Sequence, residues 1–484
     1  MMGPAAGNPT TIDRARLNGR LRTFRSAARC FVAVGSIVGL SLVFITPLWA
    51  GIDEPGHFYR AYQLTEGRLI PVEDPTGVAE GGGACLPTDV VADVEKGRLD
   101  YLAAGARDAG TFSGETPEPD LSNAIPCGED RVFVEFATFS WYSPLGYAPQ
   151  ALAVGVGRLV GAPVSIQLVL ARLATLAAYA ALALFAIGRT PRGKWAMAAA
   201  ALLPVTLFQA ATSLSPDAVT VALVMVMVSS ALRAADPELM LDRRTVLAEA
   251  AISCGLLALA KPTYVLLAVV YAVAFVGPRR RLDLWPVALP VLVAVAASMA
   301  WHQALSHLFA CDVRFFDVYP DAGEQLSNIA SSPHGFAGAV FGSVVDYGAT
   351  WVEDSIEVGG RVLVWWAWSV IVAFVGFVVV GLQASDHETL TLHWSQRLVL
   401  LGSALVGLFA VIGGWLLHCS PVGLEVVNAP HVRLLVPIVP LVLIGVAPRR
   451  APRPLDSARA ELPVALALVP FYVVWLVCVG LRMH

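Results

Sequence analysis

The chain has 484 residues, of which 56% are hydrophobic and only 14% are charged, and its mean hydropathy is +0.66. Soluble domains carry about 25% charged residues, so this composition excludes a soluble globular enzyme and a disordered chain. The formal net charge of −4 also excludes a nucleic-acid binder, which needs an excess of lysine and arginine. The composition therefore predicts an integral membrane protein.

The first apolar run that can cross a hydrocarbon core of about 30 Å covers residues 30–49. Residues 1–29 before it form a basic leader, whose arginines are Arg14, Arg16, Arg20, Arg22, Arg25 and Arg29. A signal peptide cleaved near Ala50 is the alternative interpretation, but Leu48 and Trp49 suit such a cleavage site poorly and the run is long. We expect a retained anchor with a cytosolic N-terminus, because arginine-rich flanks stay on that side.

The same charge rule places the later turns and predicts about eleven transmembrane helices. Basic or mixed clusters are expected in the cytosol, at 189–194, 233–244, 279–281, 397 and 449–459. Three other turns then lie on the outer face, at 213–217, 261–264 and 417–433. The first predicted span is 30–49, and helices 2–7 fall within 163–301, at 163–187, 195–214, 217–233, 245–260, 263–278 and 284–301. Helices 8–11 fall within 361–484, at 361–382, 397–417, 432–447 and 461–480, which leaves the C-terminus outside.

Two segments are too polar to be buried in lipid, and they cover residues 50–162 and 302–360. Long ordered connections are usually functional, so we expect them to form one extracytoplasmic cap. Within the first, the apolar stretch 143–160 cannot cross without breaking the charge rule, which predicts a helix lying on or dipping into the outer face. The predicted fold is thus an all-α polytopic membrane protein with a loop cap.

The cysteines predict disulfides on the outer side, where such bonds persist. Cys85 and Cys127 both lie in the first outer segment and are the expected pair. Cys311 and Cys419 lie in later outer segments and form a second candidate pair.

The segment 52–62, directly beyond the first span, is the most informative motif. Pro55 suits the first turn of a helix, which predicts Glu54 as the N-cap and Gly67 as the stop. Asp53 and Glu54 are then adjacent carboxylates at a helix N-terminus, where the helix dipole favours the ionised form. An ionised carboxylate there takes a proton from a hydroxyl or holds a cation, and plain helix capping is the alternative.

Other polar residues near the membrane are further candidates. Tyr142 lies in an aromatic stretch that either stacks on a sugar or forms an interfacial belt. Asp217 lies at an outer turn, where an acid is a functional candidate by default. Four basic residues allow two interpretations: the side chain binds a lipid phosphate, or it extends to the lipid headgroups. They are Arg172, Lys261, Arg361 and Arg433. Asp354 precedes the predicted span 361–382 and is a further candidate. No metal-ligand spacing is found among the histidines His302, His307, His418 and His431.

At these motifs the chain resembles the bacterial membrane protein family called "domain of unknown function 2142". The matching segments are DEPGHFYRAYQLTEG (53–67), YSPLGYAPQALAVGVGRLVG (142–161), LLPVTLFQAATSLSPDAVTVAL (202–223), AKPTYVLL (260–267) and RLLVP from Arg433. That family in turn resembles the GT-C fold of membrane glycosyltransferases, in which an acidic pair after the first span lies in the active site.

The resemblance implies a glycosyltransferase in the bacterial plasma membrane that uses a polyprenyl-phosphate sugar on the extracytoplasmic face. It implies Asp53 and Glu54 as catalytic residues and a set of substrate-binding residues: His57, Tyr59, Arg60, Tyr142, Arg172, Asp217, Lys261, Asp354 and Arg433. The acceptor is a glycan, lipid or protein of the cell envelope, no nucleic acid is involved, and a divalent cation is the one cofactor considered. A transporter or flippase of a lipid-linked saccharide, or a non-catalytic envelope scaffold, is the alternative.

Overall fold

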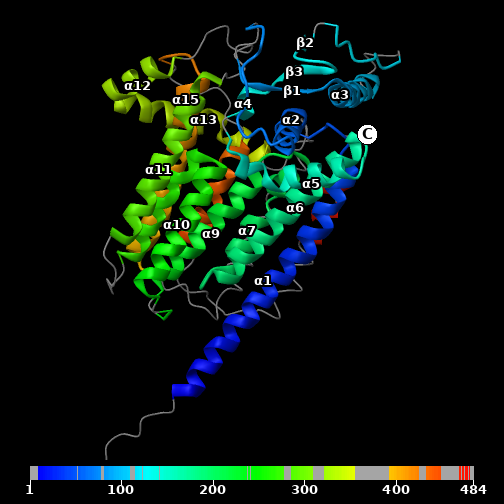
Figure 1. The fold of residues 1–484 in the computed structure, drawn as a ribbon. Helices are drawn as coiled ribbons and strands as arrows, with labels where there is room; N and C mark the ends of the chain where they lie inside the picture. The colour runs from blue at the N-terminus through cyan, green and yellow to red at the C-terminus, as the bar shows by residue number, and fades with distance from the viewer. Residues whose placement is uncertain are drawn as a thin grey trace, which may run out of the picture.

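A computed structural model describes most of the chain, in residues 9–51, 53–77, 81–108, 115–122, 124–140, 142–236, 238–239, 241–276, 285–308, 321–354, 392–423, 432–447 and short pieces of 468–479. A helical bundle makes up its lower part, and a smaller layer with the strands covers one end (Figure 1). Helix α1 (Pro9–Ile45) runs along the bundle and projects beyond it at the opposite end.

Five helices in the described part of the chain are long and apolar enough to cross a membrane. Their apolar segments are Ser26–Ile45 of α1, Val164–Arg189 (α6), Asp217–Ala235 (α9), Ala288–Leu308 and Trp394–Cys419 (α15). The count is six if one bent pair is a single span, namely α7 (Lys194–Ala201) and α8 (Pro204–Thr212), which meet at 54°; a re-entrant loop is the other arrangement that fits such a pair. The bend precedes Pro204, because proline cannot continue a helix and restricts the residue before it.

These elements confirm the predicted spans 30–49, 163–187, 217–233, 284–301 and 397–417 within a few residues, and 195–214 is the bent pair. Helix α11 (Trp285–Leu305) continues into the 3-10 turn η3 (Ser306–Leu308). The prediction 245–260 is helix α10 (Arg243–Ala260). Two predictions correspond to shorter apolar elements, the 3-10 helix η2 (Pro262–Ala274) and the run of η6 (Val432–Leu434), η7 (Val436–Ile438) and α16 (Val439–Val446). The span 361–382 and most of 461–480 lie outside the described residues, so the total of eleven stays a prediction.

Helix α9 forms the centre of the bundle. Its apolar window is 83% buried, against 22% for the window that begins at Ala288. A helix that is apolar on every side is stable only when other helices surround it, and α9 packs against α6, α10 and η2. Its first residue, Asp217, is thereby fixed at the end of the bundle that the cap covers.

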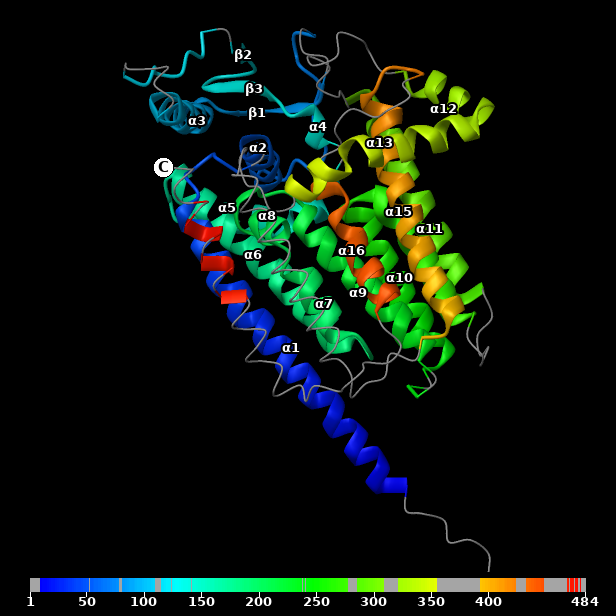
Figure 2. The same cartoon turned by 180° about the vertical axis from the view of Figure 1, so that it is seen from behind.

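The cap contains a three-stranded antiparallel sheet, which corrects the prediction of an all-α fold. Its strands are β1 (Gly83–Pro87), β2 (Ile125–Pro126) and β3 (Arg131–Glu135), in the order β1-β3-β2. Helix α3 (Thr88–Asp108) packs on the sheet, and the short helix α4 (Ala137–Ser140) follows it (Figure 2). In β3 the consecutive residues Val132 and Phe133 are both buried, and because neighbouring side chains point to opposite faces of a strand, both faces of the sheet are covered there.

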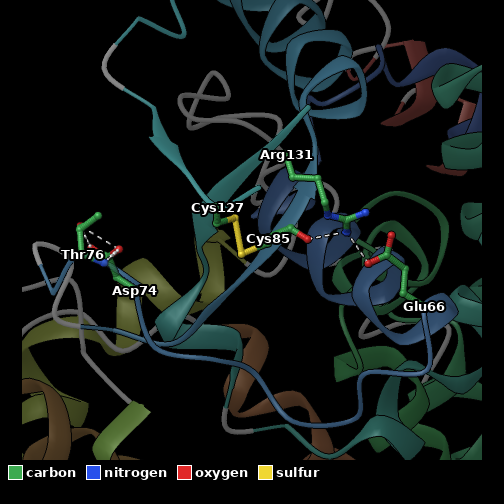
Figure 3. Close-up of a disulfide and its surroundings, with 6 residues drawn as sticks. All are labelled: Glu66, Asp74, Thr76, Cys85, Cys127 and Arg131. Carbon is green, nitrogen blue, oxygen red and sulfur yellow. Dashed lines mark hydrogen bonds and ion pairs between the residues drawn. A yellow bond between two sulfur atoms is a disulfide. The ribbon is translucent and has the colours of Figure 1, made fainter. Parts of the chain in front are cut away.

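The predicted disulfide between Cys85 and Cys127 is present, with Cα atoms 6.0 Å apart. Arg131 beside it donates to the carbonyl of Cys85 and to the Glu66 carboxylate, each at 2.6 Å (Figure 3). This arginine therefore ties the sheet to the end of helix α2 (Glu54–Thr65). Cys419 is also disulfide-bonded, and its predicted partner Cys311 lies outside the described residues.

The second polar segment joins the same end of the molecule. It forms α12 (Ala322–Ser331) and α13 (Pro333–Asp354) beside the top of α15 (Figure 2). The backbone N–H of Gly82 donates to the carbonyl of Leu308 at 2.7 Å, so the two polar segments contact each other as predicted.

Charged side chains gather at both ends of the bundle. At the end away from the cap, Arg189 and Arg233 both pair with Glu249, and Arg192 pairs with Asp236 at 3.6 Å. The turns predicted to share the outer face lie together at the other end, where Lys261 contacts Asp217. The turns at 189–194, 233–244, 213–217 and 261–264 thus group as predicted, whereas 279–281 and 449–459 lie outside the described residues. The direction of this axis across the membrane remains a prediction.

Candidate functional site

Asp53 begins the site in an unusual backbone conformation. It is the N-cap residue of α2 and has a left-handed φ of 57°, and its side chain makes no capping hydrogen bond. The prediction that Glu54 is the N-cap is therefore wrong, and simple capping does not explain the Asp53 carboxylate. The predicted stop is confirmed, because Gly67 follows the helix with a φ of +77°.

The Glu54 carboxylate lies on the protein side of α2 and forms a buried ion pair with Arg172. The Nε–Oε1 distance is 2.6 Å, the Nη2–Oε2 distance is 2.7 Å, and both side chains are 0% exposed. Arg172 also donates to the carbonyls of Val43, Thr46 and Pro47 at the end of α1. The pair thus joins α1, α2 and α6, and the predicted roles of Glu54 in catalysis and Arg172 in phosphate binding stay predictions.

Asp53 instead faces a group that we call the charged cluster: Asp53, Asp217, Lys261 and Arg433. Arg433 donates from Nη2 to Oδ2 of Asp53 at 2.6 Å, and its Nε lies 3.8 Å from Oδ2 of Asp217. Lys261 donates to the other oxygen of Asp217. The four residues come from the starts of α2 and α9, the end of α10 and η6, so four distant segments supply one site.

Arg433 has unused hydrogen-bonding capacity in this cluster. Its Nε and Nη1 atoms are buried without a hydrogen-bond partner, and its side chain is 14% exposed. Buried donors are almost always satisfied, so two open donors on one guanidinium need an explanation. A bound anion, such as a phosphate, would supply an acceptor for one of these donors, because guanidinium groups donate to phosphate oxygens.

Aromatic side chains surround the cluster. The Lys261 ammonium lies 5.1 Å from the centre of the Tyr142 ring and 5.9 Å from that of Tyr264. The Tyr264 hydroxyl donates to the carbonyl of Leu434 at 2.6 Å, which fixes the chain beside Arg433. These contacts stabilise the Lys261 cation at the site.

His57 forms a buried pair with Tyr147 at the side of the cluster. Its Nδ1 lies 2.8 Å from the Tyr147 hydroxyl, and burial lowers the pKa of His57 to about 4. The imidazole is therefore neutral at pH 7, although Asp53 and Asp217 oppose this shift. A neutral imidazole contributes hydrogen bonding without adding charge to the site.

Two residues other than glycine adopt left-handed backbone conformations next to the cluster, in addition to Asp53. They are Trp49, with a φ of 66°, and Leu214, with a φ of 53°. The Leu214 carbonyl accepts a 3.0 Å hydrogen bond from Gln150, which holds the turn before Asp217. Such strain costs about 1–3 kcal/mol per residue and concentrates at functional sites.

The structure brings together six of the predicted site residues: Asp53, His57, Tyr142, Asp217, Lys261 and Arg433. It places Tyr59 against Glu95 of α3 at 3.2 Å, and it engages Arg60 with the carbonyls of Leu69 and Tyr142. These contacts hold both side chains within the cap, and their substrate-binding roles stay predictions. Asp354 ends α13, and its side chain lies outside what the structure describes, as does all of Arg361.

Tyr147 and Tyr264 were given no role from the sequence. The signal was present, because each lies within five residues of a predicted site residue, but an aromatic belt explains such tyrosines equally well. A metal site finds no support in the described residues, where no three His, Cys, Asp or Glu side chains are grouped to hold an ion. The two carboxylates of the cluster are each paired with a cation, so we derive no step through a metal.

Comparison with known proteins agrees with the sequence motifs. The family described as "Predicted membrane protein (DUF2142)" matches residues 36–442, which include all four residues of the charged cluster. The chain belongs to this family. No curated protein and no solved structure matches it. Membership of the DUF2142 family and the apolar helices together support a membrane protein.

Proposed function

We propose that the protein is an integral membrane glycosyltransferase, which moves a sugar from a polyprenyl-phosphate donor to a cell-envelope acceptor. The observation that carries this proposal is the pairing of the 38%-exposed Asp53 carboxylate with Arg433, whose two further donors are open. One site thus offers a base for a hydroxyl group and cations for a phosphate. This is the combination that sugar transfer from a phosphate donor requires.

The proposed reaction takes place on the extracytoplasmic face. The basic leader and the arginines around Glu249 lie at the end opposite the cluster, which supports this orientation by the positive-inside rule. Nucleotide sugars are absent outside the cytosol, whereas a lipid-linked donor reaches the site from the bilayer. The acceptor is a glycan, lipid or protein of the cell envelope.

In the proposed step, the Asp53 carboxylate takes the proton of the acceptor hydroxyl. The acceptor oxygen forms a bond to the anomeric carbon as the bond from this carbon to the phosphate oxygen breaks. The lipid phosphate leaves with the electron pair, and Lys261 and Arg433 stabilise its negative charge. In-line attack inverts the configuration, and Asp217 holds Lys261 in place through its ion pair.

Donor binding also explains how Asp53 can act as a base although it is paired with Arg433. An arginine bound to Asp53 stabilises the carboxylate and lowers its basicity. A phosphate that accepts a hydrogen bond from Nη1 of Arg433 shares the charge of this arginine, so the basicity of Asp53 rises when the donor is bound. Arg433 would thus couple donor binding to activation of the acceptor.

The test compares lipid-linked sugars and envelope glycans in a deletion strain that carries wild-type or Asp53→Asn protein. Asparagine tolerates the left-handed backbone, so the substitution removes the charge and keeps the local conformation. Asp130→Asn is the matched control, since Asp130 is also left-handed, with a φ of 54°, and lies in the cap turn before β3. We expect Asp130→Asn to restore the glycan and Asp53→Asn to leave the donor unused. Restoration by Asp53→Asn at normal expression would overturn the catalytic role.

A further inference from the structure

An apolar groove runs beside the candidate site along helix α5 (Ala148–Leu159). Its volume is about 770 Å³, and it lies between α5 and the end of α2, with Leu64 and Leu69 on the α2 side. It begins at Pro144 in the 3-10 turn η1 (Pro144–Tyr147). The α5 helix has 12 residues, so the groove extends over about 18 Å.

The groove offers almost nothing polar to an occupant. Its two polar lining residues are Thr65 and Arg158, and they are bonded to each other. Arg158 also pairs with Glu66 at 3.6 Å and stacks on the Tyr62 ring at 4.2 Å. An occupant that lies along these walls must therefore be apolar itself.

The groove begins at η1, and residues in and directly before this turn contact the charged cluster and His57. Pro144 at its start is two residues from Tyr142, whose ring contacts the Lys261 ammonium. The Ser143 hydroxyl donates to the carbonyl of Leu259, and Tyr147 bonds His57. The segment that begins at Tyr142 therefore contacts the Lys261 cation at its start and leads into the apolar groove along α5 at its end.

The open side of the groove is apolar as well. Leu152 is 72% exposed, Val156 is 57% exposed and Leu159 is 87% exposed, all on α5. A contiguous exposed apolar surface of this kind marks contact with lipid or with an apolar ligand. A hydrocarbon chain in the outer leaflet can therefore enter from the side, without passing the cap.

We propose that this groove binds the isoprenoid chain of the lipid that carries the sugar, with its phosphate at Lys261 and Arg433. This inference rests on the proposed function and adds where the donor lies. The charge distribution favours this one occupant, because an anionic head and a long apolar tail match the two ends of the segment. The groove then selects donors by chain length, while the cluster selects the phosphate.

Gly155 provides the test, because a side chain there projects into the groove. A Cβ atom at Gly155 would lie 3.7 Å from Cγ2 of Thr65, so Gly155→Phe fills the space without a backbone clash. Ala151→Trp fills it from the preceding turn of the same helix face. Gly255→Phe on α10 is the matched control, because the described atoms leave the space around its Cβ empty.

The experiment measures binding of a long-chain polyprenyl phosphate and of geranyl phosphate to the purified full-length protein, after thermal unfolding confirms that each variant is folded. We expect Gly155→Phe and Ala151→Trp each to weaken long-chain binding at least about tenfold. Geranyl phosphate binding and the Gly255→Phe control should stay unchanged. Equal loss of both ligands, or undiminished long-chain binding in both groove variants, would overturn the proposal.

A third arm separates the donor from bulk lipid. If phosphatidylglycerol competes as well as polyprenyl phosphate, the groove is a general lipid contact and the proposal fails. The outcome is also distinct from the catalytic proposal. Sugar transfer that depends on Asp53 but not on the groove would refute only this inference, whereas chain-length-selective binding without transfer would refute only the proposed function.

Discussion

Asp53 and Glu54 are neighbours in the sequence, yet their carboxylates lie in opposite environments. Glu54 is within the helix and 0% exposed against Arg172, whereas Asp53 precedes the helix and is 38% exposed beside Arg433. The left-handed backbone of Asp53 produces this divergence, because it turns the chain just before α2 begins. The acidic pair thus divides into a structural member and a reactive member.

The buried ion pair of Glu54 with Arg172 predicts a measurable effect on stability. Arg172→Met leaves the Glu54 charge buried without its partner, and we expect the free energy of unfolding to fall by about 3–5 kcal/mol. Adding Glu54→Gln removes the charge and should recover part of this loss. Thermal unfolding in detergent measures both, with Arg98→Met as the control, because its ion pair with Glu95 is exposed. A double variant less stable than Arg172→Met alone would contradict this role.

His57 predicts a pH dependence. Its pKa is about 4 in the folded protein, and the ordinary value is 6.5. The unfolded chain therefore binds the proton more readily, so stability is complete above pH 6.5 and falls as the pH drops towards 4. The difference corresponds to about 3 kcal/mol. His57→Gln should flatten this part of the stability curve, and an unchanged slope in that variant would show that other groups cause it.

At the scale of elements, the chain predicts starts and stops better than contacts. Pro55 and Gly67 delimit α2 because both act locally on the backbone. The sheet was missed, although the β-branched and aromatic run Val132–Val134 favours a strand, because β1 has no such run to pair with it. The partner of Asp53 was also beyond reach, since Arg433 lies 380 residues away. The distribution of basic clusters between the spans predicts that Asp53 and Arg433 lie on the same face of the membrane, but it does not predict that their side chains contact each other.

The disulfide predicts that the cap resists proteolysis. Cys85 and Cys127 are 42 residues apart, and closing a loop of this size stabilises the fold by about 4 kcal/mol in the chain-entropy description. Cys85→Ser with Cys127→Ser should therefore increase proteolysis within 88–126 and leave the bundle intact. Cys30→Ser, which removes a cysteine that forms no disulfide, is the control. Equal protease resistance of both proteins would contradict a stapled cap.

The whole molecule is arranged along one axis, with the basic end at one side of the bundle and the cap at the other (Figure 1). The sequence predicted which turns share an end, because charge and span length determine that parity. It could not predict that these turns converge on one cluster, since the contacts depend on how α2, α9, α10 and η6 pack. Because these segments converge, motifs that are separate in the sequence form one candidate site.

The orientation is tested by labelling single cysteines in intact cells. Gly105→Cys in α3 and Arg244→Cys at the start of α10 both place the thiol at exposed positions. A membrane-impermeant maleimide should label the first above the background of the unmodified chain. The second should react only after the membrane is permeabilised. The reverse pattern would place the cap and the charged cluster in the cytosol.

The most direct measurement is sugar transfer by the purified protein in lipid vesicles, followed as release of polyprenyl phosphate from its sugar-loaded form in the presence of acceptor. A positioned general base contributes about 10²–10⁴-fold to the rate. Asp53→Asn should therefore reduce transfer at least about a hundredfold, with donor binding retained, while Asp130→Asn remains at the wild-type rate. Transfer by Asp53→Asn at the wild-type rate would contradict the account.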